Sequence, residues 1–192
     1  MKENQNLRFY MNGSVLDLVF GSCADQSVDA VVNAANACLL AGDGICGAIF
    51  QKAGMEKLTK ACKKFKTPLL NGEVAVTPAF DMTNTSYIIH AVGPDFREIP
   101  EKEGLLLLFF AYYNSLLALK NHDLHSIAFP LISAGIFSGD LSRPSRISAT
   151  KCVDAIQKFT TDFPDYPITV NLCAFTEDEF REVKLGFMDK IR

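Results

Sequence analysis

After an opening hairpin, strand-like and helix-like segments alternate along this chain, and no other feature constrains its fold as much. Apolar or alternating runs of strand length occur at Leu7–Met11, Val15–Phe20, Asp29–Asn33, Glu73–Thr77, Tyr87–Val92, Ser126–Ile132 and Ile168–Ala174. Helical patterns occur at Gly47–Ala53, Met55–Phe65, Glu101–Lys120 and Pro144–Phe159, and a capping box of Thr176 and Glu179 precedes a last helix. This order predicts an α/β domain with a mostly parallel sheet covered on both faces, and ligands at the carboxyl ends of its strands.

The composition fits a single domain of this kind. The chain has 192 residues, of which 48% are hydrophobic, enough for one well-packed core but short for two. Its net charge of -3 argues against a protein held to nucleic acid by a general basic surface. The N-terminal segment lacks the apolar core of a secretory signal, and the longest apolar run, Leu105–Tyr113, is too short to span a membrane. We therefore expect one domain over residues 1–192, in a soluble, cytoplasmic monomer.

The cysteines and histidines show no metal-ligand spacing, so we expect neither a metal site nor a cofactor. No CxxC pair is present, and a core of this size needs no disulfides, which predicts free thiols. The cysteines are Cys23, Cys38, Cys46, Cys62, Cys152 and Cys173. His90 lies inside an apolar strand and is interpreted as a hydrogen-bonded core residue. The lysines between Lys57 and Lys66 are interpreted as the exposed face of a helix.

The first loop with recognisable chemistry runs from Asn33 to Gly47. Asn33 and Asn36 carry carboxamides that suit hydroxyl groups such as those of a ribose. Four of the 12 glycines fall within the short stretch from Gly42 to Gly54, and glycine lets backbone N–H groups approach an anion closely. Because the following helix adds the positive end of its dipole, the loop resembles a phosphate or pyrophosphate cradle. A tight strand-to-helix crossover with no ligand is the plainer alternative.

Gly42, Gly44 and Gly47 also spell the dinucleotide-binding pattern GxGxxG. The spacing argues against that interpretation, because eight residues separate Asn33 from Gly42 and the stretch some twenty residues on is rich in lysine rather than ending in an acid. A nicotinamide or flavin enzyme is kept as a weaker alternative. Hydrolysis of nucleoside triphosphates is weaker still, since the Lys-Ser/Thr pair of a Walker motif is missing.

A second loop of small residues follows the strand that ends near Ile132. It offers a hydroxyl at Ser133, a backbone turn and the aromatic ring of Phe137, which could stack on a sugar or cap a cleft. Phe175 directly follows the last strand and could pack against an adenine face, although core packing is the plainer explanation for either ring. Two such loops could grip one diphosphate.

Several motifs, taken in order, are similar to those of the macrodomain family. They are Val31-Val-Asn-Ala-Ala-Asn36, the loop through Gly47-Ala-Ile-Phe50 and Ala53-Gly54, His90-Ala-Val-Gly-Pro94, and Pro130-Leu-Ile-Ser-Ala-Gly-Ile-Phe137. The resemblance covers most of the chain. It implies a three-layer α/β/α fold with a mixed sheet and a cleft that binds ADP-ribose, and it implies partners such as ADP-ribosylated proteins or O-acetyl-ADP-ribose.

The resemblance also implies roles for individual residues. Asn33 and Asn36 would lie near the terminal ribose, and Ser22 and Cys23 near adenine together with Phe175. The first diphosphate loop would comprise Gly42, Gly44, Ile45 and Cys46, and the second Ser133, Ala134, Gly135, Ile136 and Phe137.

Three departures from the family pattern bear on activity. Cys46 replaces an Asp that helps to position or activate water, Ser22 replaces an Asp that accepts a hydrogen bond from adenine, and Ser138 displaces Gly139 by one position. Asp43 stands where Gly is usual, and we expect it outside the phosphate cradle because a carboxylate beside a diphosphate is unfavourable. Cys46 could act as a nucleophile, but a small buried thiol is the plainer expectation.

The resemblance implies a hydrolase for ADP-ribose esters on proteins or for O-acetyl-ADP-ribose, and the candidate catalytic residues are Asn36 and Cys46. A non-catalytic ADP-ribose-binding module is the alternative, because the loop Asp is absent. Binding of free nucleotides or RNA ends is a third, weaker hypothesis.

Overall fold

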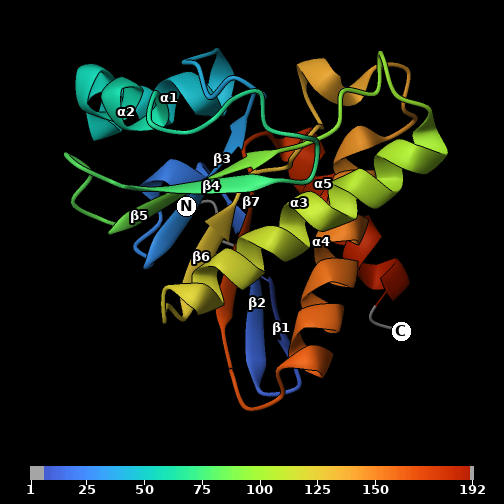
Figure 1. Ribbon diagram of the computed structural model, residues 1–192. Coiled ribbons are helices and arrows are strands. Elements are labelled where there is room, and N and C mark those ends of the chain that lie inside the picture. The colour runs from blue at the N-terminus through green and yellow to red at the C-terminus, as the bar shows by residue number, and fades with distance from the viewer. Residues whose placement is uncertain (1–6, 191–192) are drawn as a thin grey trace.

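The computed structural model describes residues 7–190, which form one seven-stranded mixed sheet between two helical layers (Figure 1). The strands are β1 Leu7–Met11, β2 Ser14–Phe20, β3 Ala30–Ala35, β4 Val74–Pro78, β5 Tyr87–Val92, β6 Ser126–Phe129 and β7 Thr169–Ala174. Their order across the sheet is β1-β2-β7-β6-β3-β5-β4. The edge pairs β1–β2 and β4–β5 are antiparallel, and the four pairs between them are parallel. The sheet is thus mixed and mostly parallel, as expected.

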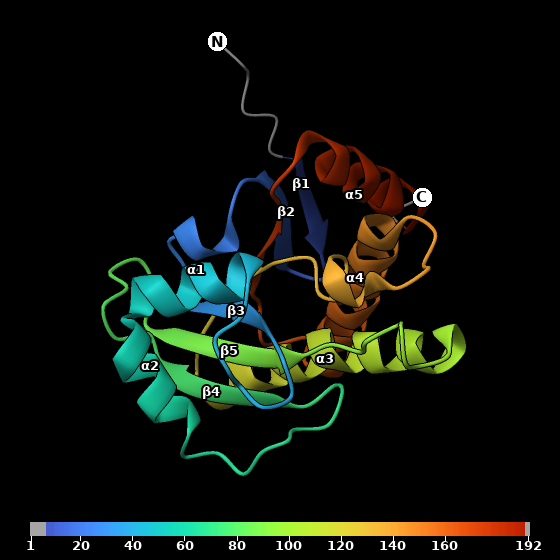
Figure 2. The ribbon, with the colours of Figure 1, turned by 90° about the horizontal axis from the view of Figure 1, so that it is seen from above.

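The helices divide between the two faces of the sheet, as the view from above shows (Figure 2). They are α1 Gly44–Ala53, α2 Met55–Cys62, α3 Glu101–Asn121, α4 Pro144–Asp162 and α5 Glu177–Lys190, with short 3-10 turns η1 Cys23–Asp25 and η2 Ile136–Ser138. One apolar core packs α3, α4 and α5 against the sheet, and a second packs α1, α2 and η1 against the other face. This arrangement is the expected three-layer α/β/α sandwich.

Strand β3 lies near the middle of the sheet, where both of its faces are covered. Side chains alternate between the faces of a strand, so Ala30 and Val32 enter the core of α3, α4 and α5, whereas Val31 and Ala35 enter the core of α1 and α2. Asn33 has the same parity as Val31, so its side chain points into the layer beneath α1. Only the residues after Ala35 leave the sheet.

Local signals in the sequence are reproduced in the turns and caps. Asn12 and Gly13 have φ angles of 45° and 82°, the positive values that a tight hairpin turn requires. Thr176 Oγ1 accepts from Glu179 N at 3.2 Å, and Glu179 Oε2 accepts from Thr176 N at 3.0 Å. The capping box at the start of α5 is therefore confirmed.

Four predicted boundaries were wrong by three residues. Helix α2 ends at Cys62 rather than Phe65, and α4 ends at Asp162 rather than Phe159. The other two are the end of β6 and the start of α1. Strand β6 ends at Phe129 rather than Ile132, because Pro130 has no N–H to donate to the ladder. Helix α1 begins at Gly44 rather than Gly47, since Gly44 adopts a φ of 60° that turns the loop directly into the helix.

The six cysteines are free thiols, as predicted. Within residues 7–190, no helix is both long and apolar enough to span a membrane.

Candidate functional site

A cleft of about 650 Å³ opens at the carboxyl ends of β2, β7, β6 and β3. Each of these strands contributes the residues that follow it, because parallel neighbours all end at the same edge of the sheet. The wall consists of Gly21, Ser22, Cys23, Ala34, Asn36, Gly42, Asp43, Gly44, Ile45, Cys46, Ala48, Pro130, Leu131, Ser133, Ala134, Gly135, Ile136, Phe137, Cys173, Phe175 and Glu179. The order of the strands therefore sets the order of the residues along the cleft. Ser22 and Phe175 lie toward one end and Asn36 toward the other.

The first loop is closed by the side chain of Asn36. Its Nδ2 donates to Leu40 O at 2.7 Å, and its Oδ1 accepts from Leu40 N at 3.0 Å, which ties the turn from Asn36 to Leu40. Further along, Gly47 in the first turn of α1 packs against Gly42 so closely that a Cβ on Gly47 would lie 2.5 Å from Gly42 O. Small residues are thus required here, and they bring the amino end of α1 to the cleft.

Residues 94–97 contact the second loop, Pro130–Gly139, and hold its shape. Ser133 adopts a φ of 56°, and its Oγ donates to Pro94 O at 2.7 Å. Phe96 N donates to Phe137 O at 2.9 Å, and the Arg97 guanidinium lies 5.5 Å from the centre of the Phe137 ring. The Ser133 hydroxyl therefore holds the loop in shape, which leaves backbone groups to face the cleft.

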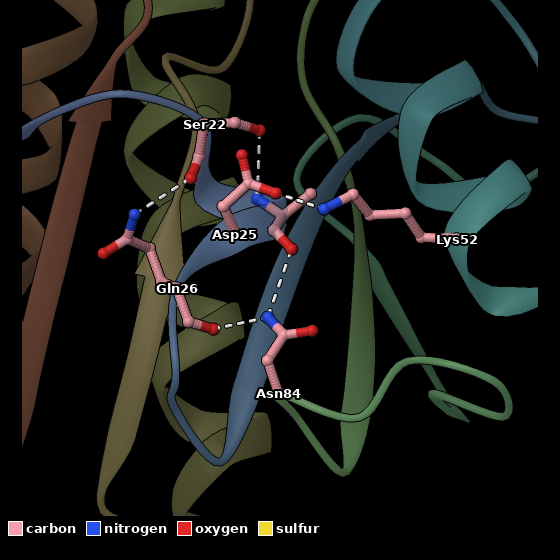
Figure 3. Close-up of polar contacts among 6 residues, drawn as sticks. Ser22, Asp25, Gln26, Lys52 and Asn84 are labelled. Carbon is pink, nitrogen blue, oxygen red and sulfur yellow. Dashed lines mark hydrogen bonds and ion pairs between the residues drawn. The ribbon is translucent and has the colours of Figure 1, made fainter.

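At the opposite end of the cleft, Ser22 caps the short turn η1 (Figure 3). Its Oγ accepts from Ala24 N at 3.2 Å, and its carbonyl accepts from Gln26 Nε2 at 3.0 Å. Asn84 Nδ2 in turn donates to the carbonyls of Ala24 and Gln26, at 3.1 and 2.6 Å. The Ser22 hydroxyl is thus already an acceptor for the backbone, but it keeps a lone pair and a proton for a ligand.

A buried polar network lies beneath the end of the cleft formed by β3. Asn33 Nδ2 lies 3.1 Å from His90 Nδ1 and 3.6 Å from Cys46 Sγ, and His90 Nε2 lies 3.0 Å from Thr77 Oγ1. His90 is fully buried, and burial lowers its pKa to about 4, so the ring is neutral at pH 7. The prediction of a hydrogen-bonded core histidine is confirmed.

The network reaches the cleft through Cys46. The Cys46 thiol donates to Leu40 O at 3.6 Å, the same carbonyl that accepts from Asn36. Burial raises the pKa of this thiol above its usual value, although hydrogen bonds from Asn33 and Gly42 oppose the shift. The raised pKa favours the neutral thiol, which donates its proton to Leu40 O.

No lysine, arginine or histidine occurs among the residues that line the cleft; its charged side chains are Asp43 and Glu179. The Glu179 carboxylate accepts from Phe175 N at 2.8 Å and from Thr176 N, so it is engaged by the backbone. Asp43 is exposed at the start of α1, lines the cleft, and makes no capping hydrogen bond with its side chain. Any anion in the cleft would be held by backbone N–H groups and the α1 dipole.

The structure brings nearly all of the candidate residues together in the wall of this cleft. The exception is Asn33, which is 1% exposed and lies beneath the wall, with its carboxamide directed at His90 and Cys46. The alternation of side chains along β3 explains this position, because Asn33 faces the same side of the sheet as Val31. Sequence reasoning missed Glu179 as part of the wall, although its place in the capping box directly after β7 could have indicated it.

Comparison with known proteins agrees with this architecture. The Macro domain family profile matches residues 32–147, more than half of the chain. The chain belongs to the macro domain family. A macro domain-containing protein of Ralstonia nicotianae is 38% identical over 148 residues, which cover 77% of this chain and 80% of the relative.

Two further comparisons concern ADP-ribose compounds. A Salmonella newport protein named O-acetyl-ADP-ribose deacetylase is 36% identical over 149 residues, 76% of this chain and 82% of that one. A variant of the Oceanobacillus iheyensis macrodomain, solved with ADPR, superposes with a TM-score of 0.87 at 30% identity and covers 97% of this chain and 98% of its own.

Proposed function

We propose that this macro domain binds ADP-ribose in the cleft and hydrolyses esters of ADP-ribose, either on protein carboxylates or as O-acetyl-ADP-ribose. The observation that carries the proposal is the pair of backbone loops, Asn36–Gly47 and Pro130–Gly139, which face one cleft without a cationic side chain. A site of this kind suits a diphosphate bound by N–H groups. The Salmonella deacetylase and the structure solved with ADPR support the choice of ligand.

The order of the strands supports the following placement of the ligand in the proposed complex. Adenine lies at the end formed by β2 and β7, between the ring of Phe175 and the polar groups of Ser22 and Cys23. The diphosphate lies between the two loops, and Phe137 covers the sugar beyond it. The terminal ribose then reaches Asn36, at the β3 end. A volume of about 650 Å³ is within the usual range for small-molecule sites.

In the proposed reaction, water adds to the acyl carbon of the ester. The water oxygen bonds to that carbon, the bond between the carbon and the ribose oxygen breaks, and the proton given up by the water passes through the substrate phosphate to the ribose oxygen. Asn36 and the substrate phosphate position the water, and loop amides stabilise the developing charge. Acyl esters of this kind need little acid catalysis, so no protein carboxylate is required.

A non-catalytic ADP-ribose reader is the second candidate, and the state of Cys46 favours it. A neutral thiol that is hydrogen-bonded to Leu40 O cannot activate water as the Asp of related hydrolases does. Asn33 Nδ2 already points at position 46 and could donate to a carboxylate placed there. If the wild type is inactive and Cys46→Asp creates turnover, the reader function is favoured; if Cys46→Ala abolishes an existing activity, the thiol takes part.

Two measurements test the proposal. Calorimetric titration with ADP-ribose tests binding, with Asn36→Ala expected to weaken it about ten-fold through loss of the ribose contact and of the Leu40 turn. Release of ADP-ribose from a protein modified on glutamate or aspartate tests the reaction. Absence of binding by the wild type would reject the whole proposal, whereas binding without turnover at high enzyme concentration would leave only the reader.

A further inference from the structure

A cluster of exposed lysines lies next to the β3 end of the cleft. Between Glu56 and Glu73 the chain has five lysines and no acidic residue, although its net charge is -3. Lys57 forms an ion pair with Asp81. The other four are exposed and make no ion pair within residues 7–190; we call them the lysine patch, formed by Lys60, Lys63, Lys64 and Lys66.

The lysine patch adjoins a small cavity of about 220 Å³ at the end of α2. The cavity is lined by Cys38, Leu39, Leu40, Thr59, Cys62, Lys63, Phe65 and Thr67. Helix α2 lies beside α1 (Figure 2). Leu69 N donates to Ala37 O at 2.8 Å, which fixes this loop against the turn that follows β3.

The turn from Asn36 to Leu40 is the wall shared by the cavity and the cleft. Asn36 lines the cleft, and Cys38 and Leu40 line the cavity on the other side. Leu40 and Leu70 are 58% and 69% exposed, so apolar surface flanks the basic groups. A chain attached at the β3 end of the cleft could leave over this turn and meet the cavity and the lysine patch.

We propose that the lysine patch and the adjoining cavity bind an acidic polypeptide segment, the stretch that flanks the ADP-ribosylated residue of the substrate protein. The inference rests on the proposed function, because the ester end of the ligand must lie near Asn36. Lysines pair with carboxylates at short range, and exposed leucines can contact the aliphatic parts of a peptide. The patch would thus select protein substrates whose modified residue lies among glutamates or aspartates.

Charge and shape favour a peptide over a nucleic acid. Single-stranded nucleic acid is bound by extended basic grooves with exposed aromatic rings on which the bases stack. The lysine patch spans seven residues, and the aromatic ring beside it, Phe65, is half-buried. Outside the lysine patch the chain has 15 lysines and arginines (19 less 4) against 22 acidic residues.

Peptide binding tests the inference without requiring turnover. Two peptides carry ADP-ribose on glutamate through a hydrolysis-resistant linkage, one flanked by glutamates and the other by glutamines. The wild type is compared with Lys63→Glu/Lys64→Glu and with the equally charged control Lys102→Glu/Lys184→Glu, whose lysines lie on α3 and α5. We expect the wild type and the control to prefer the acidic peptide about five-fold at low salt and less at high salt, and the Lys63/Lys64 variant to lose the preference.

Free ADP-ribose separates this inference from the proposed function. It should bind all three proteins with equal affinity, since neither pair of lysines lines the cleft. If free ADP-ribose does not bind the wild type, the proposed function fails; the unmodified acidic peptide, labelled with a fluorophore, then tests the lysine patch alone. Equal binding of the two peptides by the wild type, a preference that survives in the Lys63/Lys64 variant, or tighter binding of a single-stranded oligonucleotide through the same lysines would overturn the inference.

Discussion

Cys46 connects a buried polar network to the wall of the cleft through its hydrogen bonds. Its thiol donates to the carbonyl of Leu40, which Asn36 also holds, and it accepts from Asn33 beneath the cleft. Position 46 therefore links the buried network to the turn that presents Asn36. The chemical requirement is a small hydrogen-bond donor, which is a different requirement from nucleophilicity.

We expect Cys46→Ser to keep the affinity for ADP-ribose within about two-fold, because a hydroxyl can still donate to Leu40 O. Cys46→Ala should weaken binding about five-fold, which corresponds to a hydrogen bond of about 1 kcal/mol. Calorimetric titration of both variants checks this, with Cys38→Ala, at an exposed position outside the cleft, as the control. Equal affinities for the serine and alanine variants would show that donation by Cys46 is unimportant.

His90 makes the stability of the protein depend on pH in a defined window. Its pKa is about 4 in the folded protein, against about 6.5 for an exposed histidine, because burial disfavours the charged ring. The unfolded state therefore binds the proton first as pH falls. The stabilising contribution is complete above about pH 6.5 and is lost progressively down to about pH 4.

This difference amounts to about 2 kcal/mol of unfolding free energy between pH 7 and pH 5. His90→Gln should be less stable than the wild type at pH 7, because bonds in the buried network are weakened, but it should lose about 2 kcal/mol less on acidification. Urea unfolding of both proteins at pH 7 and pH 5 measures these losses of unfolding free energy. His122→Gln is the control, and parallel losses in wild type and His90→Gln would contradict the assigned pKa.

At the level of elements, the contact between the first loop and α1 decides the shape of the cradle. Gly42 and Gly47 form the two sides of one backbone contact. A Cβ on Gly47 would lie 2.5 Å from Gly42 O, whereas a Cβ on Gly42 would have its nearest atoms at 3.8 Å or more. The two positions thus make a matched pair of tests.

We expect Gly47→Ala to lower the free energy of unfolding by about 2 kcal/mol and to reduce ADP-ribose affinity at least ten-fold, because the loop must move away from α1. Gly42→Ala should change stability by less than about 0.5 kcal/mol, since its methyl group meets only ordinary contacts. Denaturant unfolding and calorimetry measure both effects. A tolerated Gly47→Ala would mean that the loop is free to adjust.

For the whole molecule, the cleft couples ligand binding to the stability of the fold, because it spans the ends of four strands of the sheet. Residues that follow β2, β7, β6 and β3 all line it, so a ligand that fills it contacts widely separated parts of the chain. Binding to the folded state alone stabilises it by about 2.7 kcal/mol at a ligand concentration about one hundred times Kd. For a chain of this size that corresponds to a rise in Tm of about 5–10 °C.

ADP-ribose should therefore raise Tm by that amount, and AMP or ribose 5-phosphate, each of which fills one end of the cleft, should raise it less at equal concentration. Scanning fluorimetry of the wild type with the three ligands checks this. In Asn36→Ala, the difference between the Tm shifts caused by ADP-ribose and by AMP should shrink. Equal shifts for ADP-ribose and AMP would show that the β3 end of the cleft contributes nothing.

The sequence by itself determined the element order, the caps and the residues at the strand ends, because hydrophobic periodicity and turn chemistry are local properties. Since parallel strands end at one edge, it also identified both loops of the cleft. Tertiary structure alone decided that Asn33 lies beneath the cleft and joins His90 to Cys46, because these contacts join residues far apart in the chain. It also decided that Glu179 belongs to the wall and that the lysine patch lies beside the turn of Asn36, since local patterns carry no information on which elements become neighbours.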